Sequence, residues 1–227
     1  MHKGVAMTIQ EAIRERHSVR RYQEKMIPSE VRAALENSVE EVNRETGLHL
    51  QLIWEEPKAF KPGVFGYGFF HGVRNYLVLA GKESEDLEEK CGYYGEKILL
   101  EAQMLGLNSC WVGLTYRKIP GTYTLDEGER LVLVAALGYG QTAGSPHRNK
   151  PLLQLADLKE NDPAWYQDGV RMALLAPTAV NQQKFHIEHK GDEVTITAGN
   201  GPFSKVDLGI VRYHFEAGAG KGSFHWK

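Results

Sequence analysis

The sequence is poor in cysteine and has no long apolar segment. Cys91 and Cys110 are its two cysteines among 227 residues, too few for the disulfide framework of a small secreted domain. Apolar runs such as "LVLVAALGYG" from Leu131 have the length of a strand and fall short of the roughly 18 residues that a membrane-spanning helix needs. The chain has no basic-then-apolar leader and no Asn-x-Ser/Thr acceptor site. We therefore expect a cytoplasmic protein without a membrane segment.

The chain also lacks a strong charge of either sign. Its 27 Lys and Arg stand against 29 Asp and Glu, which gives a formal net charge of −2. Such a balance predicts no general attraction to nucleic acids or to acidic membranes. A local cluster of basic residues therefore needs a local explanation, and we expect the partner to be a small molecule.

Helix caps and apolar periodicity predict a mixture of helices and strands. Thr8 and Glu11 form a capping box, and Pro28 and Gly47 bracket a second helical pattern. Helices are expected at about 8–13, 28–43, 85–106, 163–175 and 205–217. Strands are expected at 48–54, 75–81 and 131–139, with a hairpin over 184–199 that turns at 190–192. This mixture predicts the α+β class.

Several possible sites fail on spacing. The glycine-rich tail from Gly218 to Ser223 lacks the Ser or Thr that would follow the lysine of a phosphate loop. His186 and His189 lie three residues apart on a strand, so they point to opposite faces; we expect solvent-facing histidines and no metal site. Cys110 has no neighbouring histidine to activate it and is expected to be a buried thiol. Any chemistry would therefore depend on a cofactor.

Two basic clusters offer sites for an anion. In "RHSVRRY", extended chain would place Arg16, Ser18 and Arg20 on one face, so two guanidinium groups and a hydroxyl could converge on a phosphate monoester. A second cluster, His147-Arg148-Asn149-Lys150, follows the buried strand that ends in "GYG". Solvated surface is the alternative interpretation for each cluster taken alone.

Four stretches together resemble the nitroreductase family of FMN-dependent oxidoreductases. "AIRERHSVRRY" (Ala12 to Tyr22) resembles the family's Arg-rich, Ser-containing element, which binds the FMN phosphate and part of the ribityl chain; the resemblance implies contacts from Arg16, His17, Ser18 and Arg20. "EAQMLGLNSCWVGL" (Glu101 to Leu114) resembles the helix and Gly-Leu-Gly-x-x-Trp segment whose backbone runs beside the flavin ring, which implies contacts from Trp111, Val112, Gly113 and Leu114. Trp111 as a core residue is the alternative.

The other two stretches lie in the C-terminal part of the chain. "LVLVAALGYG" followed by "HRNKP" is similar to the late strand and basic loop that return to the phosphate, which implies Arg148 and Lys150. "LLAPTAVNQQKF" (Leu174 to Phe185) resembles the Ala-Pro-Ser-x-x-Asn-x-Gln-Pro-Trp segment, although Lys184 and Phe185 replace Pro-Trp. The implied FMN contacts here are Pro177, Thr178, Asn181 and Gln183. Side-chain amides suit the donor and acceptor edge of a flavin, but Asn181 could instead only shape a turn.

The order of these stretches departs from the family pattern. In the family, the Asn/Gln segment (here Leu174 to Phe185) usually follows soon after the Arg-rich element (here Ala12 to Tyr22), whereas in this chain about 160 residues separate the two. "VRAALENSVEEVN" before "LHLQLIW" parallels "VRMALLAPTAVNQQ" before "KFHIEHK", which indicates an internal duplication. We predict one nitroreductase-like unit over 1–227, with a central mixed or antiparallel sheet flanked by helices and with pseudo-two-fold halves at 1–160 and 161–227. Because the Arg-rich and Asn/Gln elements each occur once, we expect one FMN per chain and a monomer that completes its own site.

The resemblance implies an activity that no side chain of the sequence specifies. It implies that NAD(P)H delivers a hydride to flavin N5 and that a nitroaromatic or quinone then takes the electrons. A cation near flavin N1 and O2 would stabilise the anionic reduced flavin, and Arg20 is our candidate for it. The catalytic side chains stay unassigned. A flavin-binding carrier or sensor without turnover is the alternative, and a flavin-free interaction module is a third. The aromatic loop from Glu55 to Gly72 is a candidate wall or lid of the substrate pocket.

Overall fold

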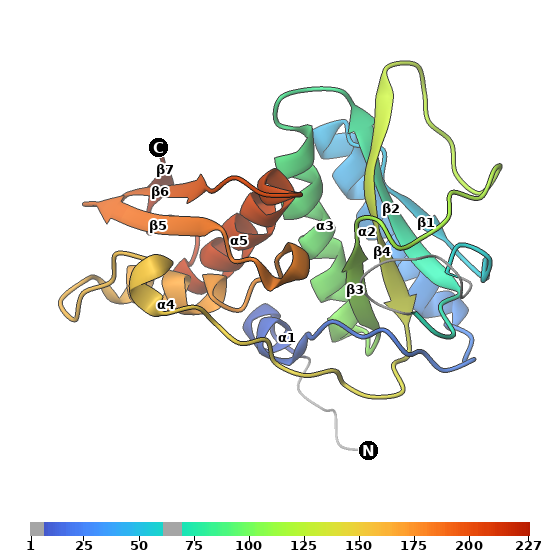
Figure 1. Cartoon of the computed structure of the whole chain (residues 1–227), viewed down its shortest axis with the longest axis horizontal. Coiled ribbons are helices and arrows are strands. Elements are labelled where there is room, and N and C mark those ends of the chain that lie inside the picture. The colour runs from blue at the N-terminus through green and yellow to red at the C-terminus, as the bar shows by residue number, and fades with distance from the viewer. Residues whose placement is uncertain (1–6, 61–69) are drawn as a thin grey trace. The chain divides into compact units, whose positions relative to one another are not determined.

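The computed structural model of the chain describes residues 7–60 and 70–227 (Figure 1). The chain divides into two compact units. The unit that we call the four-strand unit comprises Glu15–Leu87 and Ile98–Ser145. The second, the three-strand unit, comprises Met1–Arg14, Glu88–Lys97 and Pro146–Lys227. Helix α3 (Leu87–Met104) contributes residues to both units.

An antiparallel sheet organises the four-strand unit. Its strands follow the order β1 (Gln51–Ile53), β2 (Asn75–Lys82), β4 (Glu129–Gly138) and β3 (Asn108–Val112). Strands β1, β2 and β4 occupy the segments where the sequence predicts strands, with β1 shorter than expected. Strand β3 was not predicted, since it has five residues and lies between a helix end and Gly113.

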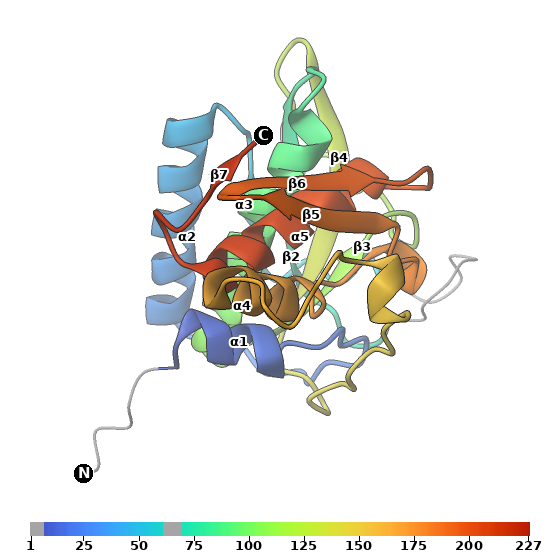
Figure 2. The ribbon, with the colours of Figure 1, turned by 90° about the vertical axis from the view of Figure 1, so that its left-hand side faces the viewer.

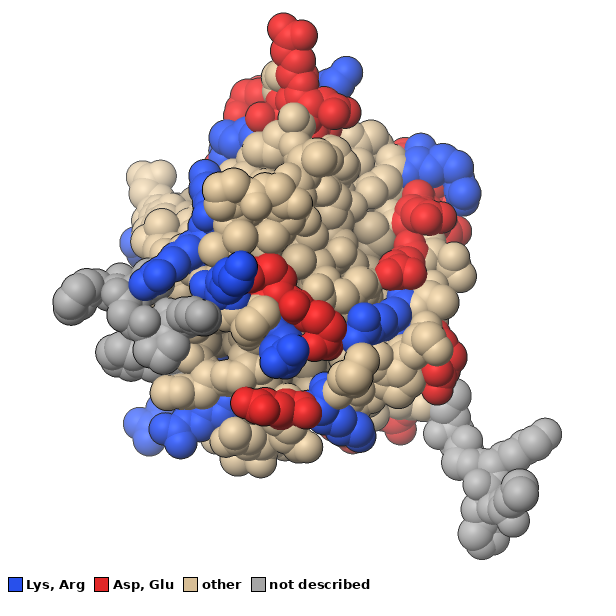
Figure 3. All heavy atoms as spheres, turned by 90° about the vertical axis from the view of Figure 1, so that its right-hand side faces the viewer, with Lys and Arg blue, Asp and Glu red and all other residues tan. Residues whose placement is uncertain are grey.

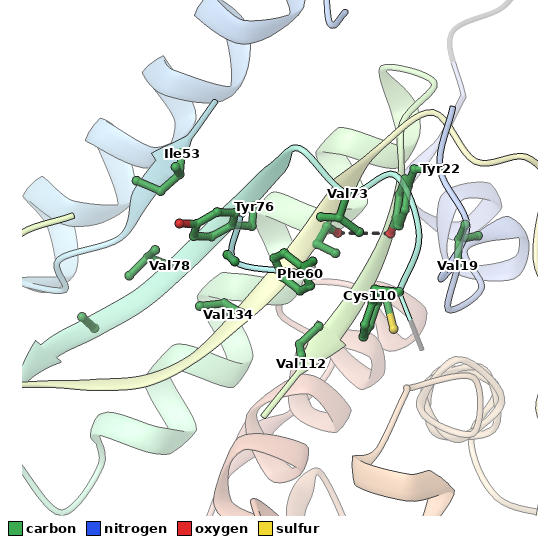
Figure 4. Close-up of a cluster of buried hydrophobic side chains, with 14 residues drawn as sticks. Val19, Tyr22, Ile53, Phe60, Val73, Tyr76, Val78, Cys110, Val112 and Val134 are labelled. Atoms are coloured by element: carbon green, nitrogen blue, oxygen red, sulfur yellow. Dashed lines mark hydrogen bonds between the residues drawn. The ribbon is translucent and has the colours of Figure 1, made fainter. Parts of the chain in front are cut away.

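A hydrophobic cluster covers one face of this sheet (Figure 4). Tyr76 and Val78 of β2 alternate with residues that are buried on the other face, as the period of two in a strand requires. Phe60 packs edge-on against Phe70 and Tyr76, with ring centroids 5.3 and 5.6 Å apart. Every residue of β2 before Lys82 is buried, so both faces of the sheet are covered.

Thr8, Gly47 and Gly106 lie at helix ends as predicted, although the first two helices extend past the expected 13 and 43 to Glu15 and Thr46. In α1 (Ile9–Glu15) the Thr8 backbone N–H donates to the Glu11 carboxylate at 2.7 Å, and the Glu11 N–H donates to the Thr8 hydroxyl at 3.3 Å. Helix α2 (Ser29–Thr46) begins after Pro28 and ends at Gly47, whose φ of 69° is left-handed. Gly106 takes the same conformation just after α3.

Two helices and a hairpin build the three-strand unit. Helix α4 (Ala164–Ala173) packs against α5 (Ser204–Ala219), and β5 (Phe185–Lys190) pairs antiparallel with β6 (Glu193–Ala198) beside α5 (Figure 2). The hairpin turns at Gly191 and Asp192, within the predicted turn. Strand β7 (His225–Trp226) adds to β6 in parallel and was not predicted.

Glycines let α5 approach α3 closely within the three-strand unit. A Cβ on Gly209 would lie 2.0 Å from the Glu89 carbonyl oxygen, and one on Gly92 would lie 2.0 Å from the Val206 carbonyl oxygen. Real Cβ atoms essentially never come within 3.0 Å of such an atom. The two helix backbones therefore touch at a point where only glycine fits.

The prediction that His189 faces solvent is wrong. Its side chain is 16% exposed and its ring lies 4.0 Å from that of Tyr166, centroid to centroid, with Asp162 3.3 Å from Nε2. The alternation of β5 places His189 on the side of the buried Phe185 and Ile187, where its ring packs against Trp165 and Tyr166 of α4. His186 is partly exposed and pairs with Asp157.

The α+β prediction is confirmed, while the internal duplication stays a prediction. Two 3-10 turns, η1 (Leu152–Gln154) and η2 (Ala179–Asn181), were not predicted. Within 7–60 and 70–227, no helix is long and apolar enough to cross a bilayer. Figure 3 shows Lys and Arg interspersed with Asp and Glu on one face, in keeping with the near-balanced charge.

Candidate functional site

The Arg-rich segment is extended, as predicted, and runs beside β3 in the four-strand unit. The Val19 N–H donates to the Ser109 carbonyl at 3.0 Å, and Ser18 and Ser109 form a parallel bridge. On the other side the His71 N–H donates to the Arg20 carbonyl at 2.9 Å. Backbone pairing therefore holds the segment straight and fixes the direction of each side chain.

Arg16, Ser18 and Arg20 all influence the pKa of one buried thiol, Cys110. Burial raises the pKa of Cys110, while the charge of Arg20, a hydrogen bond with Ser18 and the charge of Arg16 lower it. Burial also raises the pKa of Tyr22, against the charges of Arg20 and Arg16. Arg16 is only 3% exposed, and Ser18 and Arg20 are half-buried. All three residues therefore influence Cys110, which is the buried thiol that we expected.

The second predicted stretch continues from the same strand. Trp111 pairs with Ala135 and Val112 with Val134 in the sheet, so these residues lie on β3. Trp111 is half-buried and Val112 is buried, while Leu114 beyond the strand is 78% exposed. The bridge at Ser18 brings this stretch next to the Arg-rich segment, although about 90 residues separate them in the sequence.

The His17 side chain lies against Gly144, in the turn after β4. A Cβ on Gly144 would lie 2.8 Å from the His17 Cβ, and Gly144 has a φ of 79°. The alternation of extended chain accounts for this orientation. Contact of His17 with FMN stays a prediction.

The other two stretches meet in the three-strand unit. The Arg148 carbonyl accepts hydrogen bonds from the Asn181 side-chain amide at 3.0 Å and from the Gln183 amide at 2.8 Å. The Lys150 N–H donates to Gln183 Oε1 at 2.9 Å. The basic loop and the Asn/Gln segment therefore form one structural element, although they lie more than thirty residues apart.

The amide of Gln183 is occupied by the protein itself. Gln183 is 4% exposed, and its Nε2 also donates to Asn181 Oδ1 at 2.8 Å. Thr178 Oγ1 accepts from the Gln183 N–H at 3.0 Å, which closes the loop that begins at Pro177. Arg148, Lys150 and Asn181 are exposed. These contacts show how the loop is held, and the predicted FMN contacts of its residues stay predictions.

The same loop has an unusual backbone. Val180, Asn181 and Gln183 have φ values of 46°, 54° and 43°, in the left-handed region that favours glycine. The conformation is costly for a β-branched valine, at roughly 1–3 kcal/mol for a strained residue. Such strain persists only where surrounding contacts enforce it, and it is concentrated at functional sites.

Asp207, in the first turn of α5, makes hydrogen bonds that hold the strained loop. This residue was not identified from the sequence. Its Oδ1 accepts the Ala179 N–H at 2.9 Å and its Oδ2 accepts Gln182 Nε2 at 2.7 Å. Burial raises the pKa of Asp207 to about 6, against the lowering effect of these two hydrogen bonds. An acidic residue in the first turn of a helix is common, so the sequence carried no signal of this role.

A basic pocket adjoins the loop. It has a volume of about 300 Å³. Its nine lining residues include Lys150, Lys184 and His186 and contain no Asp or Glu. Gln183 is also among its lining residues. The pocket would favour an anionic group.

Within the described residues, one cluster has metal-ligating chemistry. Ligand atoms of His49, Asp126 and Glu129 lie within 4.8 Å of one another, a group that sequence spacing did not reveal. Glu129 Oε2 lies 2.6 Å from His49 Nδ1 and accepts the Asp126 N–H at 2.8 Å. These bonds tie the start of β4 to the chain before β1.

The candidate lid falls partly outside the described residues. Residues 61–69 of the Glu55–Gly72 loop are outside them, so its role as a wall or lid stays a prediction. Phe60 and Phe70, on either side of that stretch, are buried in the core.

Comparison with known proteins places the chain among the nitroreductases. Residues 8–219 match the protein family described as "Putative TM nitroreductase". A crystal structure from Thermotoga maritima, described as a "putative nitroreductase", is 25% identical with a TM-score of 0.67, over 96% of this chain and 86% of that one. No curated protein matches the sequence.

Two more distant structures share the fold. A structure from Desulfovibrio desulfuricans, described as a "putative nitroreductase in complex with fmn", is 22% identical with a TM-score of 0.51, over 70% of this chain and 100% of that one. An NADH dehydrogenase/NAD(P)H nitroreductase from Parabacteroides distasonis is 17% identical with a TM-score of 0.51, over 68% and 98%. The nitroreductase-like fold that the sequence predicts is thereby confirmed. Because the family match extends over nearly the whole chain, the protein belongs to this nitroreductase family.

Proposed function

We propose that the protein is an FMN-dependent oxidoreductase that takes electrons from NAD(P)H and passes them to a nitroaromatic or quinone-like acceptor. The observation that supports this proposal most strongly is that Arg16, Ser18 and Arg20 lie on one extended segment whose backbone pairs with β3, and that all three influence Cys110 on that strand. Two guanidinium groups and a hydroxyl are the donors that a phosphate monoester needs. The relative from Desulfovibrio desulfuricans contains FMN, and we extend that cofactor to this chain as part of the proposal.

The residues fit FMN better than a dinucleotide flavin. FAD binding by a Rossmann turn needs a G-x-G-x-x-G sequence for the pyrophosphate, and the sequence contains none. We propose that the Arg-rich segment holds the phosphate and that the backbone around Trp111 and Gly113 lies against the ring. The loop from Pro177 to Gln183 would offer polar groups to the flavin, and Arg148 and Lys150 would add positive charge.

The chemistry would then be supplied by the cofactor. When bound, FMN accepts a hydride at N5 and delivers electrons to a second substrate. The residues of the chain orient the cofactor, and Arg20 would stabilise negative charge on its reduced form. We assign no side chain as an acid or base.

Steady-state kinetics are expected to show ping-pong turnover. If donor and acceptor use the same position in turn, double-reciprocal plots of NAD(P)H oxidation at several quinone concentrations will give parallel lines. Intersecting lines would mean a ternary complex and would contradict a shared position. Flavin binding without NAD(P)H consumption, with nitroaromatic and quinone acceptors alike, would contradict an enzyme and leave a carrier or sensor.

A further inference from the structure

Asp207 joins a helix to the strained loop that carries Asn181 and Gln183. We propose that Asp207 is a positioning residue that holds the loop from Pro177 to Gln183 in its FMN-binding conformation. The inference rests on the proposed function, because the loop is taken to contact FMN. Asp207 itself acts through the loop and is not a catalytic residue.

Asp207 accepts hydrogen bonds from two residues of the loop. Its two carboxylate oxygens accept from the Ala179 backbone N–H at 2.9 Å and from the Gln182 side-chain amide at 2.7 Å. Gln182 Nε2 also donates to the Pro202 carbonyl at 2.8 Å, just before α5. The loop is thus tied to the start of α5 on both sides of its most strained residue, Val180.

Bonds within the loop shape it but do not attach it to the helix. Thr178 accepts from the N–H groups of Asn181 and Gln183 through its carbonyl and hydroxyl oxygens, both at 3.0 Å. Three residues with positive φ would relax to ordinary conformations if external contacts were lost. The link to Asp207 is therefore placed where it can enforce the strained conformation.

The carboxylate costs stability at neutral pH. The pKa of Asp207 is raised to about 6 by burial, above the ordinary value of 3.8. A raised pKa in the folded state means that its contribution to stability is present at low pH and is lost as pH rises through 6. Burial therefore penalises the charged form of Asp207, and its hydrogen bonds with Ala179 and Gln182 offset part of that penalty.

The test uses Asp207→Asn, which keeps the shape of the side chain and removes its charge. The substituted side chain retains an oxygen for the Ala179 N–H, but its amide N–H groups would face the Gln182 amide. We expect the Kd for FMN to rise about tenfold. In the FMN-free protein, we expect faster hydrogen exchange of the Ala179 amide, and at pH 8 a urea midpoint no lower than that of the wild type.

Two further variants sharpen the result. Asp168→Asn changes an exposed aspartate of the same unit that pairs with Arg171, and it should alter neither FMN affinity nor Ala179 exchange. Gln182→Ala removes the same link from the side of the loop. If the two residues act together, the double variant Asp207→Asn/Gln182→Ala will lose no more affinity than the more strongly affected single variant.

The outcomes separate this inference from the proposed function. A wild-type protein that binds no FMN would contradict the proposed function, while unchanged Ala179 exchange in Asp207→Asn would overturn the bracing role in either case. Equal FMN affinity of wild type and Asp207→Asn would overturn the positioning role. Asp207→Asn could also lower the urea midpoint at pH 8 and lose FMN binding only in proportion to the unfolded protein. That result would make Asp207 a structural residue and would overturn the positioning role.

Discussion

Replacement of Gly209 by alanine is expected to lower the free energy of unfolding by about 2 to 3 kcal/mol, because the new methyl group has no space. The Cβ would lie 2.0 Å from the Glu89 carbonyl oxygen and 2.6 Å from the Tyr93 nitrogen, both backbone atoms of α3. Backbone cannot move aside as the end of a flexible side chain can. The helix propensity of alanine, roughly 1 kcal/mol better than that of glycine, offsets only part of the cost.

Urea unfolding monitored by far-UV circular dichroism measures this loss. Lys205→Ala, at an exposed position of the same helix, is the control and should change stability by less than about 0.5 kcal/mol. Gly92→Ala should destabilise in the same way, and the double variant should lose less than the sum, because one displacement of α5 from α3 relieves both overlaps. A Gly209→Ala protein as stable as the wild type would mean that the helices do not cross this closely.

Replacement of Arg16 by alanine is expected to weaken FMN binding about ten- to a hundredfold. A charged hydrogen bond contributes roughly 1.5 to 3 kcal/mol, and Arg16 lies on the same extended segment as Ser18 and Arg20. Binding of riboflavin, which has no phosphate, should weaken much less in the same variant. Titration of the apoprotein with each flavin by fluorescence quenching measures both affinities.

The choice of ligand distinguishes a phosphate contact from general damage. Arg16 is buried, so its loss could loosen the segment, and that loss would affect FMN and riboflavin alike. Arg21→Ala, which changes an exposed arginine on the same extended segment, should leave both affinities near the wild-type values. Unchanged FMN affinity in Arg16→Ala, or equal weakening of both ligands, would contradict the phosphate assignment.

Local signals in the sequence predicted the elements that depend on local chemistry. The Thr8 capping box and the glycine ends at Gly47 and Gly106 each act over a few residues, so the helix boundaries could be predicted. Strand β3 was missed because its residues pair with β4, 22 to 30 positions away, and contain no alternation of their own. The orientation of His189 was missed because Tyr166, which attracts it, lies on another element.

The candidate site could be predicted only in part, for the same reason. The face shared by Arg16, Ser18 and Arg20 follows from the period of extended chain, and the segment is extended; the FMN contacts of these residues stay a prediction. The internal contacts of Gln183 depend on Arg148, 35 residues earlier, which no local pattern specifies. Asp207 reaches the loop 28 residues before it, and its burial could not be inferred from its position in a helix.

Flavin content tests the central claim most directly. The protein, purified and incubated with excess FMN, is passed through a desalting column and denatured, and the released flavin is identified by chromatography against FMN, FAD and riboflavin. We expect FMN at about one molecule per chain, because the Arg-rich element and the Asn/Gln segment each occur once in the sequence. Two FMN per chain would contradict the single site, and FAD or no flavin at all would contradict the account of an FMN-dependent nitroreductase.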